Sequence, residues 1–156
     1  MKKELATFIV NGVSHDVVIT SNMTLVELLR DELNLTGARE SCGDGDCGCC
    51  TVLIDGKPTL ACLTLAVTVK RKNILTIEGL AEGENLHPLQ KSFVEHGALQ
   101  CGYCTPGMIL SAKFLLDENP NPKREEVKKG LGGNLCRCTG YNKIIKAVLS
   151  VGGGGK

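Results

Sequence analysis

The segment SCGDGDCGCC, from Ser41 to Cys50, places four of the nine cysteines of the chain within ten positions. Glycine and aspartate fill the spaces between them, which predicts a loop rather than a strand or a helix. Within this segment Cys42, Cys47 and Cys50 read C-x4-C-x2-C, and Cys62 follows twelve residues later. This is the plant-type spacing of ligands to a 2Fe-2S cluster, so the segment predicts such a site.

The glycines of the same loop agree with a cluster site. A 2Fe-2S core held by four thiolates is an anion, and backbone N–H groups that point at it stabilise it. Turns that aim successive N–H groups at one place need left-handed backbone, which glycine adopts at little cost. We therefore interpret Gly43, Gly45 and Gly48 as cofactor-binding positions. The alternative is a surface loop whose cysteines have no role. That alternative does not explain why the ligand spacing and the glycines occur together.

A second quartet of cysteines occurs in the other half of the chain, as Cys101-x2-Cys104 and Cys136-x-Cys138. Structural zinc sites usually combine two C-x2-C pairs, and a C-x-C pair is less usual there. Helices are predicted to begin soon after both pairs, and helix N-termini favour thiolates and other anions. The spacing favours a second iron–sulfur site and leaves a zinc site as the alternative.

Composition excludes several other classes of protein. The 156 residues carry a formal net charge of +1 and only 3% aromatic residues, so the chain has neither the basic field nor the stacking platforms of nucleic-acid-binding proteins. No stretch approaches the roughly 18 apolar residues of a membrane span. The opening MKKELATFIVNG does not read as a secretory signal. We expect a cytoplasmic protein, in which many cysteines indicate metal binding or redox chemistry rather than disulfides.

The first half of the chain predicts a small α+β domain over residues 1–80. Asn11-Gly12 and Asp55-Gly56 each separate two β-rich runs, which is typical of hairpins. Between the hairpins, residues 24–37 predict one helix with Thr24 as its N-cap and an apolar stripe of leucines. Gly37 is expected to follow its end.

The second half, residues 81–151, predicts a bundle of four short helices. Residues 80–85 are the expected linker, His87-Pro88 and Thr105-Pro106 are expected helix starts, and residues 152–156 are expected to form a flexible tail.

Three motifs, CGDGDCGCCTVLIDG, QCGYCTPGM and GNLCRCTGY, resemble the small iron–sulfur subunit of the molybdenum hydroxylases. This family includes xanthine dehydrogenase and aldehyde oxidoreductase, with carbon monoxide dehydrogenase and 4-hydroxybenzoyl-CoA reductase as relatives. The resemblance covers about residues 8–148. It implies a β-grasp ferredoxin-like domain followed by a four-helix bundle, each with one 2Fe-2S cluster. It further implies that Cys42, Cys47, Cys50 and Cys62 ligate the first cluster, and that Cys101, Cys104, Cys136 and Cys138 ligate the second.

The same resemblance implies partners. A large subunit is expected to carry molybdopterin, approached by Gln100 and Cys138, and a medium subunit to carry FAD, the whole forming a dimer of heterotrimers. This chain then relays single electrons and has no catalytic site of its own. Two alternatives remain: a 4-hydroxybenzoyl-CoA reductase-like enzyme running in the reductive direction, and a free-standing two-cluster ferredoxin.

One position departs from the family pattern, because Cys49 stands where alanine is common. We interpret Cys49 as a small buried apolar side chain, a role that free cysteine fills well. The alternatives are a substitute ligand or a redox-sensitive thiol.

Overall fold

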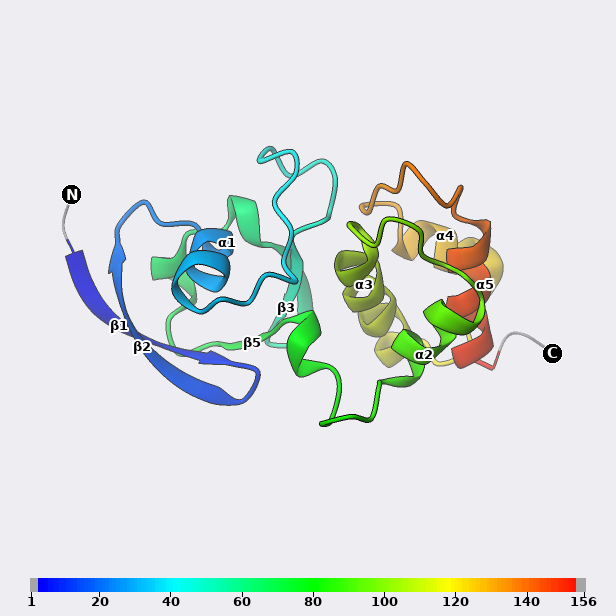
Figure 1. Cartoon of the computed structure of the whole chain (residues 1–156), viewed down its shortest axis with the longest axis horizontal. Coiled ribbons are helices and arrows are strands. Elements are labelled where there is room, and N and C mark those ends of the chain that lie inside the picture. The colour runs from blue at the N-terminus through cyan, green and yellow to red at the C-terminus, as the bar shows by residue number, and fades with distance from the viewer. Residues whose placement is uncertain (1–2, 154–156) are drawn as a thin grey trace.

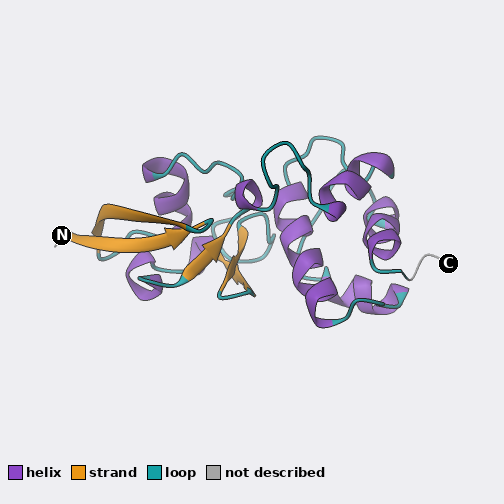
Figure 2. Cartoon of the chain, turned by 90° about the horizontal axis from the view of Figure 1, so that it is seen from below, coloured by secondary structure: helices purple, strands orange, loops and turns teal. Residues whose placement is uncertain are grey.

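The computed structural model describes residues 3–153 and places two parts side by side along the long axis of the molecule (Figure 1). A five-stranded sheet lies in the part that contains the N-terminal end, and four of the five α-helices form the other part (Figure 2). The strands are β1 (Lys3–Val10), β2 (Val13–Thr20), β3 (Thr51–Ile54), β4 (Lys57–Leu60) and β5 (Asn73–Leu75). The α-helices are α1 (Leu25–Glu27), α2 (Pro88–Glu95), α3 (Thr105–Glu118), α4 (Arg124–Gly130) and α5 (Asn142–Val151).

Both predicted hairpins are confirmed. β1 pairs with β2 and β3 pairs with β4, both antiparallel, and each pair is joined by two residues. Asn11-Gly12 and Asp55-Gly56 all have positive φ, between 49° and 80°. Such backbone matches the twist of the flanking strands, and asparagine, aspartate and glycine adopt it most readily.

β5 completes the sheet, whose strand order is β2-β1-β5-β3-β4. It pairs parallel with β1 and antiparallel with β3, so three residues join the two hairpins into one sheet. The sequence did not single out this strand, because three residues are too few to show an alternating pattern.

The predicted helix after the first hairpin is shorter than expected. Its start is confirmed, since Thr24 and Glu27 form a capping box. After Glu27 the chain continues as a π-helical turn, Leu28–Glu32, and Asn34 then adopts a φ of 56°. The expectation that Gly37 ends this helix is therefore wrong. Gly37 instead lies where the chain passes close to Ile77, and its N–H donates to the Glu78 carboxylate at 2.7 Å.

The four helices of the second part are confirmed, as are two of their starting signals. The side chain of His87 caps α2 by accepting from the N–H of Leu89, and α3 begins with Pro106 in its first turn. At the other end, Gly152 follows α5 and is buried against Leu116 and Pro122. Gly153 is exposed, and residues 154–156 of the predicted tail lie outside the described residues.

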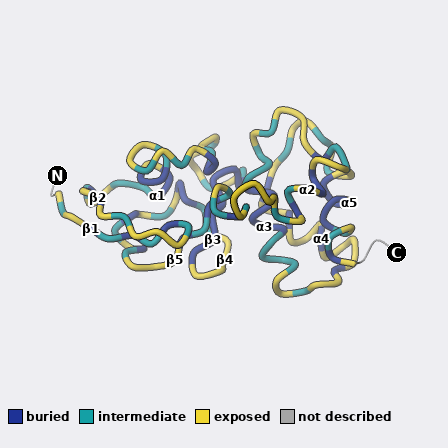
Figure 3. Tube along the Cα trace, turned by 60° about the horizontal axis from the view of Figure 1, so that its bottom comes forward, coloured by how far each residue is buried: buried dark blue, intermediate teal, exposed yellow. Residues whose placement is uncertain are grey.

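Each part has its own apolar core, and the buried residues lie in the interior of both parts (Figure 3). The first core lies between the sheet and α1, and the second lies among α2, α3, α4 and α5. Among residues 3–153, no helix is long and apolar enough to cross a membrane.

Candidate metal centres

The first cysteine quartet lies at the end of the sheet that faces the helices. Cys42 and Cys47 are half-buried on the loop before β3, and Cys50 immediately precedes that strand. Cys62 lies in the 3₁₀ turn Ala61–Leu63 that follows β4. Because β3 and β4 are paired, Cys50 and Cys62 meet across the end of the hairpin, with their Sγ atoms 3.3 Å apart.

Backbone N–H groups of the loop act on the Cys42 thiol, and the loop glycines adopt left-handed backbone. Gly43, Gly45 and Gly48 all have positive φ, from 68° to 85°. The N–H of Cys47, followed by that of Asp44, lowers the pKa of the Cys42 thiol to about 7. Burial acts in the opposite direction on Cys62 and raises its pKa to about 12, with the Cys50 thiol adding to the effect. The loop thus presents donors suited to an anionic group.

The second quartet lies where α3 begins and ahead of α5. Cys104 precedes the first residue of α3, and the Sγ atoms of Cys101 and Cys138 are 3.6 Å apart. Burial raises the pKa of Cys104 to about 12, and the neighbouring Cys136 thiol raises it further. Burial also acts to raise the pKa of Cys136, but hydrogen bonds from the hydroxyl and N–H of Thr139 outweigh it and lower that pKa. A cavity of about 230 Å³ adjoins all four cysteines.

In both quartets the thiols fall into two pairs. The first contains Cys50–Cys62, whose Sγ atoms are in contact, and Cys42–Cys47, in which the Cys47 thiol helps to lower the pKa of Cys42. The second contains Cys101–Cys138, whose Sγ atoms are in contact, and Cys104–Cys136, in which the Cys136 thiol helps to raise the pKa of Cys104. Within the described residues, no three metal-binding side chains converge on one point. A 2Fe-2S core takes two ligands on each of its two irons, so two pairs of thiols fit it. The donor set of each quartet is therefore suited to an iron–sulfur cluster.

Comparison with known proteins agrees with this donor chemistry. Residues 7–96 match the family described as a 2Fe-2S iron-sulfur cluster binding domain, and residues 76–149 match the family described as a [2Fe-2S] binding domain. The chain is 48% identical over 148 residues to the nicotinate dehydrogenase small FeS subunit of Eubacterium barkeri, covering 95% of this chain and 94% of the relative. It is 46% identical over 151 residues to a probable xanthine dehydrogenase subunit from Bacillus subtilis (strain 168), covering 97% and 87%. The chain belongs to the family of small 2Fe-2S subunits of the molybdenum hydroxylases.

The three-dimensional comparison supports the same assignment. The iron–sulfur subunit matches the crystal structure of quinoline 2-oxidoreductase from Pseudomonas putida 86 with a TM-score of 0.94 and 45% sequence identity. The match covers 97% of this subunit and 94% of that chain. Both halves of the subunit therefore share their arrangement with an oxidoreductase structure, and the mixed α+β fold expected from the sequence is confirmed.

Gln100 and Cys138, far apart in the sequence, meet at the surface of the subunit. The Gln100 Nε2 group donates to the Cys138 carbonyl oxygen at 3.0 Å, and both residues are exposed. Three large apolar residues beside the second quartet are exposed as well. They are Leu99, Tyr103 and Leu135, with 39%, 40% and 51% of their surfaces accessible.

Cys49 is buried, with 5% of its surface accessible, as expected for a small core side chain. Its Sγ lies 4.0 Å from the Cys47 carbonyl oxygen, and it lines the cavity of the second quartet. Burial raises the pKa of this thiol to about 12, and the nearby Cys47 thiol raises it further.

The sequence did not reveal the residues that connect the two quartets. Tyr103 donates from its hydroxyl to the Glu40 carbonyl oxygen, and the Arg39 guanidinium lies 5.5 Å from the centre of the Tyr103 ring. Asn134 hydrogen-bonds to Ser111 and to Gly48. Each of these contacts joins residues more than 20 positions apart, so no local pattern could have predicted it.

Proposed function

We propose that this subunit holds two 2Fe-2S clusters that relay single electrons between a molybdopterin site in a large subunit and FAD in a medium subunit. The clusters supply the redox chemistry, and the protein binds them and sets their surroundings. The observation that carries the proposal is the presence of two separate cysteine quartets, each divided into two pairs and each beside its own apolar core. Family membership supports it.

In this proposal the sheet half, residues 1–80, is a β-grasp domain that holds the plant-type cluster. Its ligands are Cys42, Cys47, Cys50 and Cys62, with Gly43, Gly45 and Gly48 shaping the loop around them. The helical half, residues 81–151, holds the second cluster with Cys101, Cys104, Cys136 and Cys138. The proposal places the subunit in the cytoplasm, where thiols stay reduced and available to iron.

The surface around Gln100 and Cys138 supports a fixed partner over a free-standing ferredoxin. Exposed Leu99, Tyr103 and Leu135 lie next to the exposed cysteines of the second quartet. A carrier that works alone in water has no need to present apolar side chains beside its cluster, whereas a subunit buries them in an interface. We assign this face to the large subunit, with Gln100 and Cys138 directed toward the pterin.

The first test is the metal and flavin content of the complex that purifies with this subunit from its native host. About four irons per molybdenum, together with FAD, is the expected result for two 2Fe-2S clusters. A ratio near eight irons indicates an additional four-iron cluster and favours a 4-hydroxybenzoyl-CoA reductase-like enzyme that works in the reductive direction. Iron without molybdenum or partners supports the ferredoxin alternative, and a colourless zinc protein contradicts the proposal. The mass of the intact complex tests whether it is a dimer of heterotrimers.

A further inference from the structure

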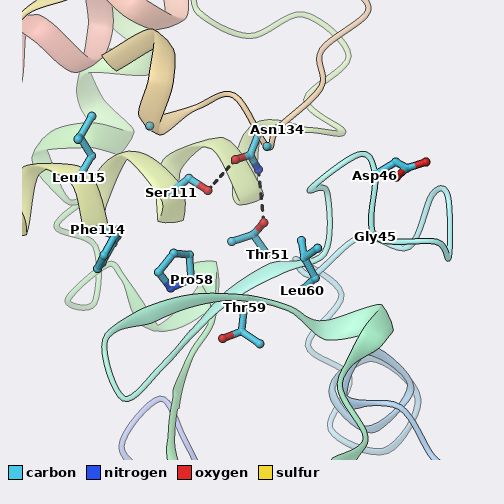
Figure 4. A pocket seen from close by; sticks show the side chains of 12 residues that line it. Gly45, Asp46, Thr51, Pro58, Thr59, Leu60, Ser111, Phe114, Leu115 and Asn134 are labelled. Atoms are coloured by element: carbon cyan, nitrogen blue, oxygen red, sulfur yellow. Dashed lines mark hydrogen bonds between the residues drawn. The ribbon is translucent and has the colours of Figure 1, made fainter. Parts of the chain in front are cut away.

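The seam between the two halves contains a cavity beside the first quartet. It has a volume of about 340 Å³ and lies between the β3–β4 hairpin and α3 (Figure 4). Pro58 and Leu60 line it from the hairpin, and Phe114 and Leu115 line it from α3. Because these apolar side chains leave space between them, their packing does not fix the spacing of the two halves here.

Asn134 is among the residues that line this cavity, and it crosses the seam. Its Nδ2 group donates to the Gly48 carbonyl oxygen at 2.9 Å, and its Oδ1 atom accepts from the Ser111 hydroxyl at 2.7 Å. Figure 4 shows the amide between Ser111 of the helical half and Thr51 of the sheet half. Only 5% of Asn134 is accessible, so water does not compete for these hydrogen bonds.

The residue after Asn134 makes a backbone contact between the two quartets themselves. The Leu135 N–H donates to the Cys47 carbonyl oxygen at 2.9 Å. Cys47 belongs to the first quartet, and Leu135 is bonded directly to Cys136 of the second. A path of covalent bonds interrupted by a single hydrogen bond therefore runs from one quartet to the other.

Glycines make this close approach possible. A Cβ on Gly48 would overlap the Gly133 carbonyl oxygen, and a Cβ on Gly107 would overlap the Gly48 carbonyl oxygen. The backbones of the two halves are thus in direct contact at Gly48, where the Asn134 amide holds them.

We propose that Asn134 is a positioning residue that sets the distance between the two cysteine quartets. The inference rests on the proposed function, because that distance matters when both quartets carry a cluster. Tyr103 also joins the halves through Glu40, but it is 40% accessible and its hydrogen bond is open to competition from water. The buried Asn134 amide, backed by Ser111, therefore has the larger part in fixing the spacing.

The test is the magnetic interaction between the clusters of the loaded, fully reduced protein, measured by electron paramagnetic resonance. Dipolar splitting falls with the cube of the distance between two spins, so it reports the spacing of the quartets directly. The decisive variant is Asn134→Asp, which keeps the size of the side chain but removes the donor to Gly48. We expect both cluster signals to persist with a smaller splitting. The control is Asn85→Ala, an exposed asparagine on the linker, which is expected to keep the wild-type splitting.

An unchanged splitting in a fully loaded Asn134→Asp protein overturns the inference. If that variant does not load both clusters, Asn134→Ala decides, because it removes the amide that joins Gly48 and Ser111 without placing a charge in the seam or replacing any predicted ligand. A reduced splitting in Asn134→Ala supports the inference, and an unchanged one overturns it. A weaker fold alone lowers the amount of loaded protein but leaves the splitting of the loaded molecules unchanged. Failure of the proposed function is recognised separately, because the wild-type protein then lacks two cluster signals.

Discussion

Two cysteines of the same loop, Cys42 and Cys49, have opposite surroundings. Backbone N–H groups, that of Cys47 first, lower the pKa of Cys42 to about 7, whereas burial raises the pKa of Cys49 to about 12. The thiolate is the nucleophilic form, so the two side chains differ in reactivity near neutral pH. Cys42, a predicted ligand, therefore differs from the additional Cys49 in its access to backbone N–H groups and to water.

We predict that iodoacetamide at pH 7.5 modifies Cys42 of the iron-free chain well before Cys49. About half or more of Cys42 is then thiolate, whereas Cys49 is almost entirely protonated and buried. Peptide mass spectrometry over a time course measures both rates within one sample. Equal rates, or faster modification of Cys49, would show that the loop surroundings described above do not hold in the iron-free chain.

We also predict that Cys49→Ala retains both clusters. The Cys49 side chain is buried and belongs to neither quartet, and although its thiol lies beside Cys47, the four predicted ligands of the first cluster are complete without it. The expected cost is about 1 kcal/mol of stability, because a small buried side chain is shortened. Iron content and visible absorbance provide the measurement, with Cys50→Ala as the matched variant that loses the first cluster. Loss of half the iron in Cys49→Ala would instead make Cys49 a ligand.

At the scale of elements, the start of α2 depends on the protonation of His87. Its Nδ1 atom accepts a hydrogen bond from the Leu89 N–H at 3.2 Å, which only the neutral ring can do. Burial lowers the pKa of His87 below its ordinary value, and the Lys113 ammonium lowers it further. The cap therefore exists only while the ring is uncharged.

The sign of the pH dependence follows from that lowered pKa. The unfolded chain binds a proton at His87 near pH 6.5, whereas the folded chain binds it only at lower pH. The contribution of the cap is thus complete above about pH 6.5 and is lost as the pH falls toward the folded value. We predict that His87→Asn, which keeps a good N-cap, flattens the fall of Tm between pH 7 and 5.5. Identical slopes in the wild-type and variant proteins would contradict this role.

The sequence predicted those elements that are determined by residues next to one another in the chain. Asn11-Gly12 and Asp55-Gly56 form the expected turns, and Thr24 with Glu27 forms the expected capping box. The prediction that Gly37 ends a helix was wrong because the need for glycine there is not local. The chain at Gly37 passes against Ile77 and Glu78, about 40 positions away. The short strand β5 was missed for the same reason, since its partners on β1 and β3 define it.

The same difference between local and long-range causes applies to the candidate site. The cysteines and loop glycines were visible because their spacing is part of the sequence. Asn134 was not, since an asparagine after two glycines reads equally well as a turn residue. Its importance comes from Ser111 and Gly48, which only the folded chain brings to it.

At the scale of the whole molecule, several predicted cluster ligands also belong to the two apolar cores or pack against them. Cys50 and Cys62 belong to the first core, and Cys104 and Cys136 pack against the second. No disulfide links the elements that carry these cysteines. The iron–sulfur clusters are therefore expected to add to the contacts that hold such segments together, such as those between the loop before β3 and the turn after β4.

We predict that removing iron from the purified subunit lowers its Tm and broadens its unfolding transition. Ligation that exists only in the folded chain contributes its binding free energy to folding, and iron-free cysteines with raised pKa leave protonated thiols crowded in both cores. Differential scanning calorimetry before and after chelation measures the effect, and reconstitution with iron and sulfide should restore the original Tm. The charge changes as well, from about −3 for the loaded subunit to the formal +1 of the iron-free chain, so anion exchange separates the two forms before calorimetry. A sharp transition at the same Tm in the separated iron-free form would mean that the two apolar cores alone determine the fold, and that the clusters are added to a structure already complete.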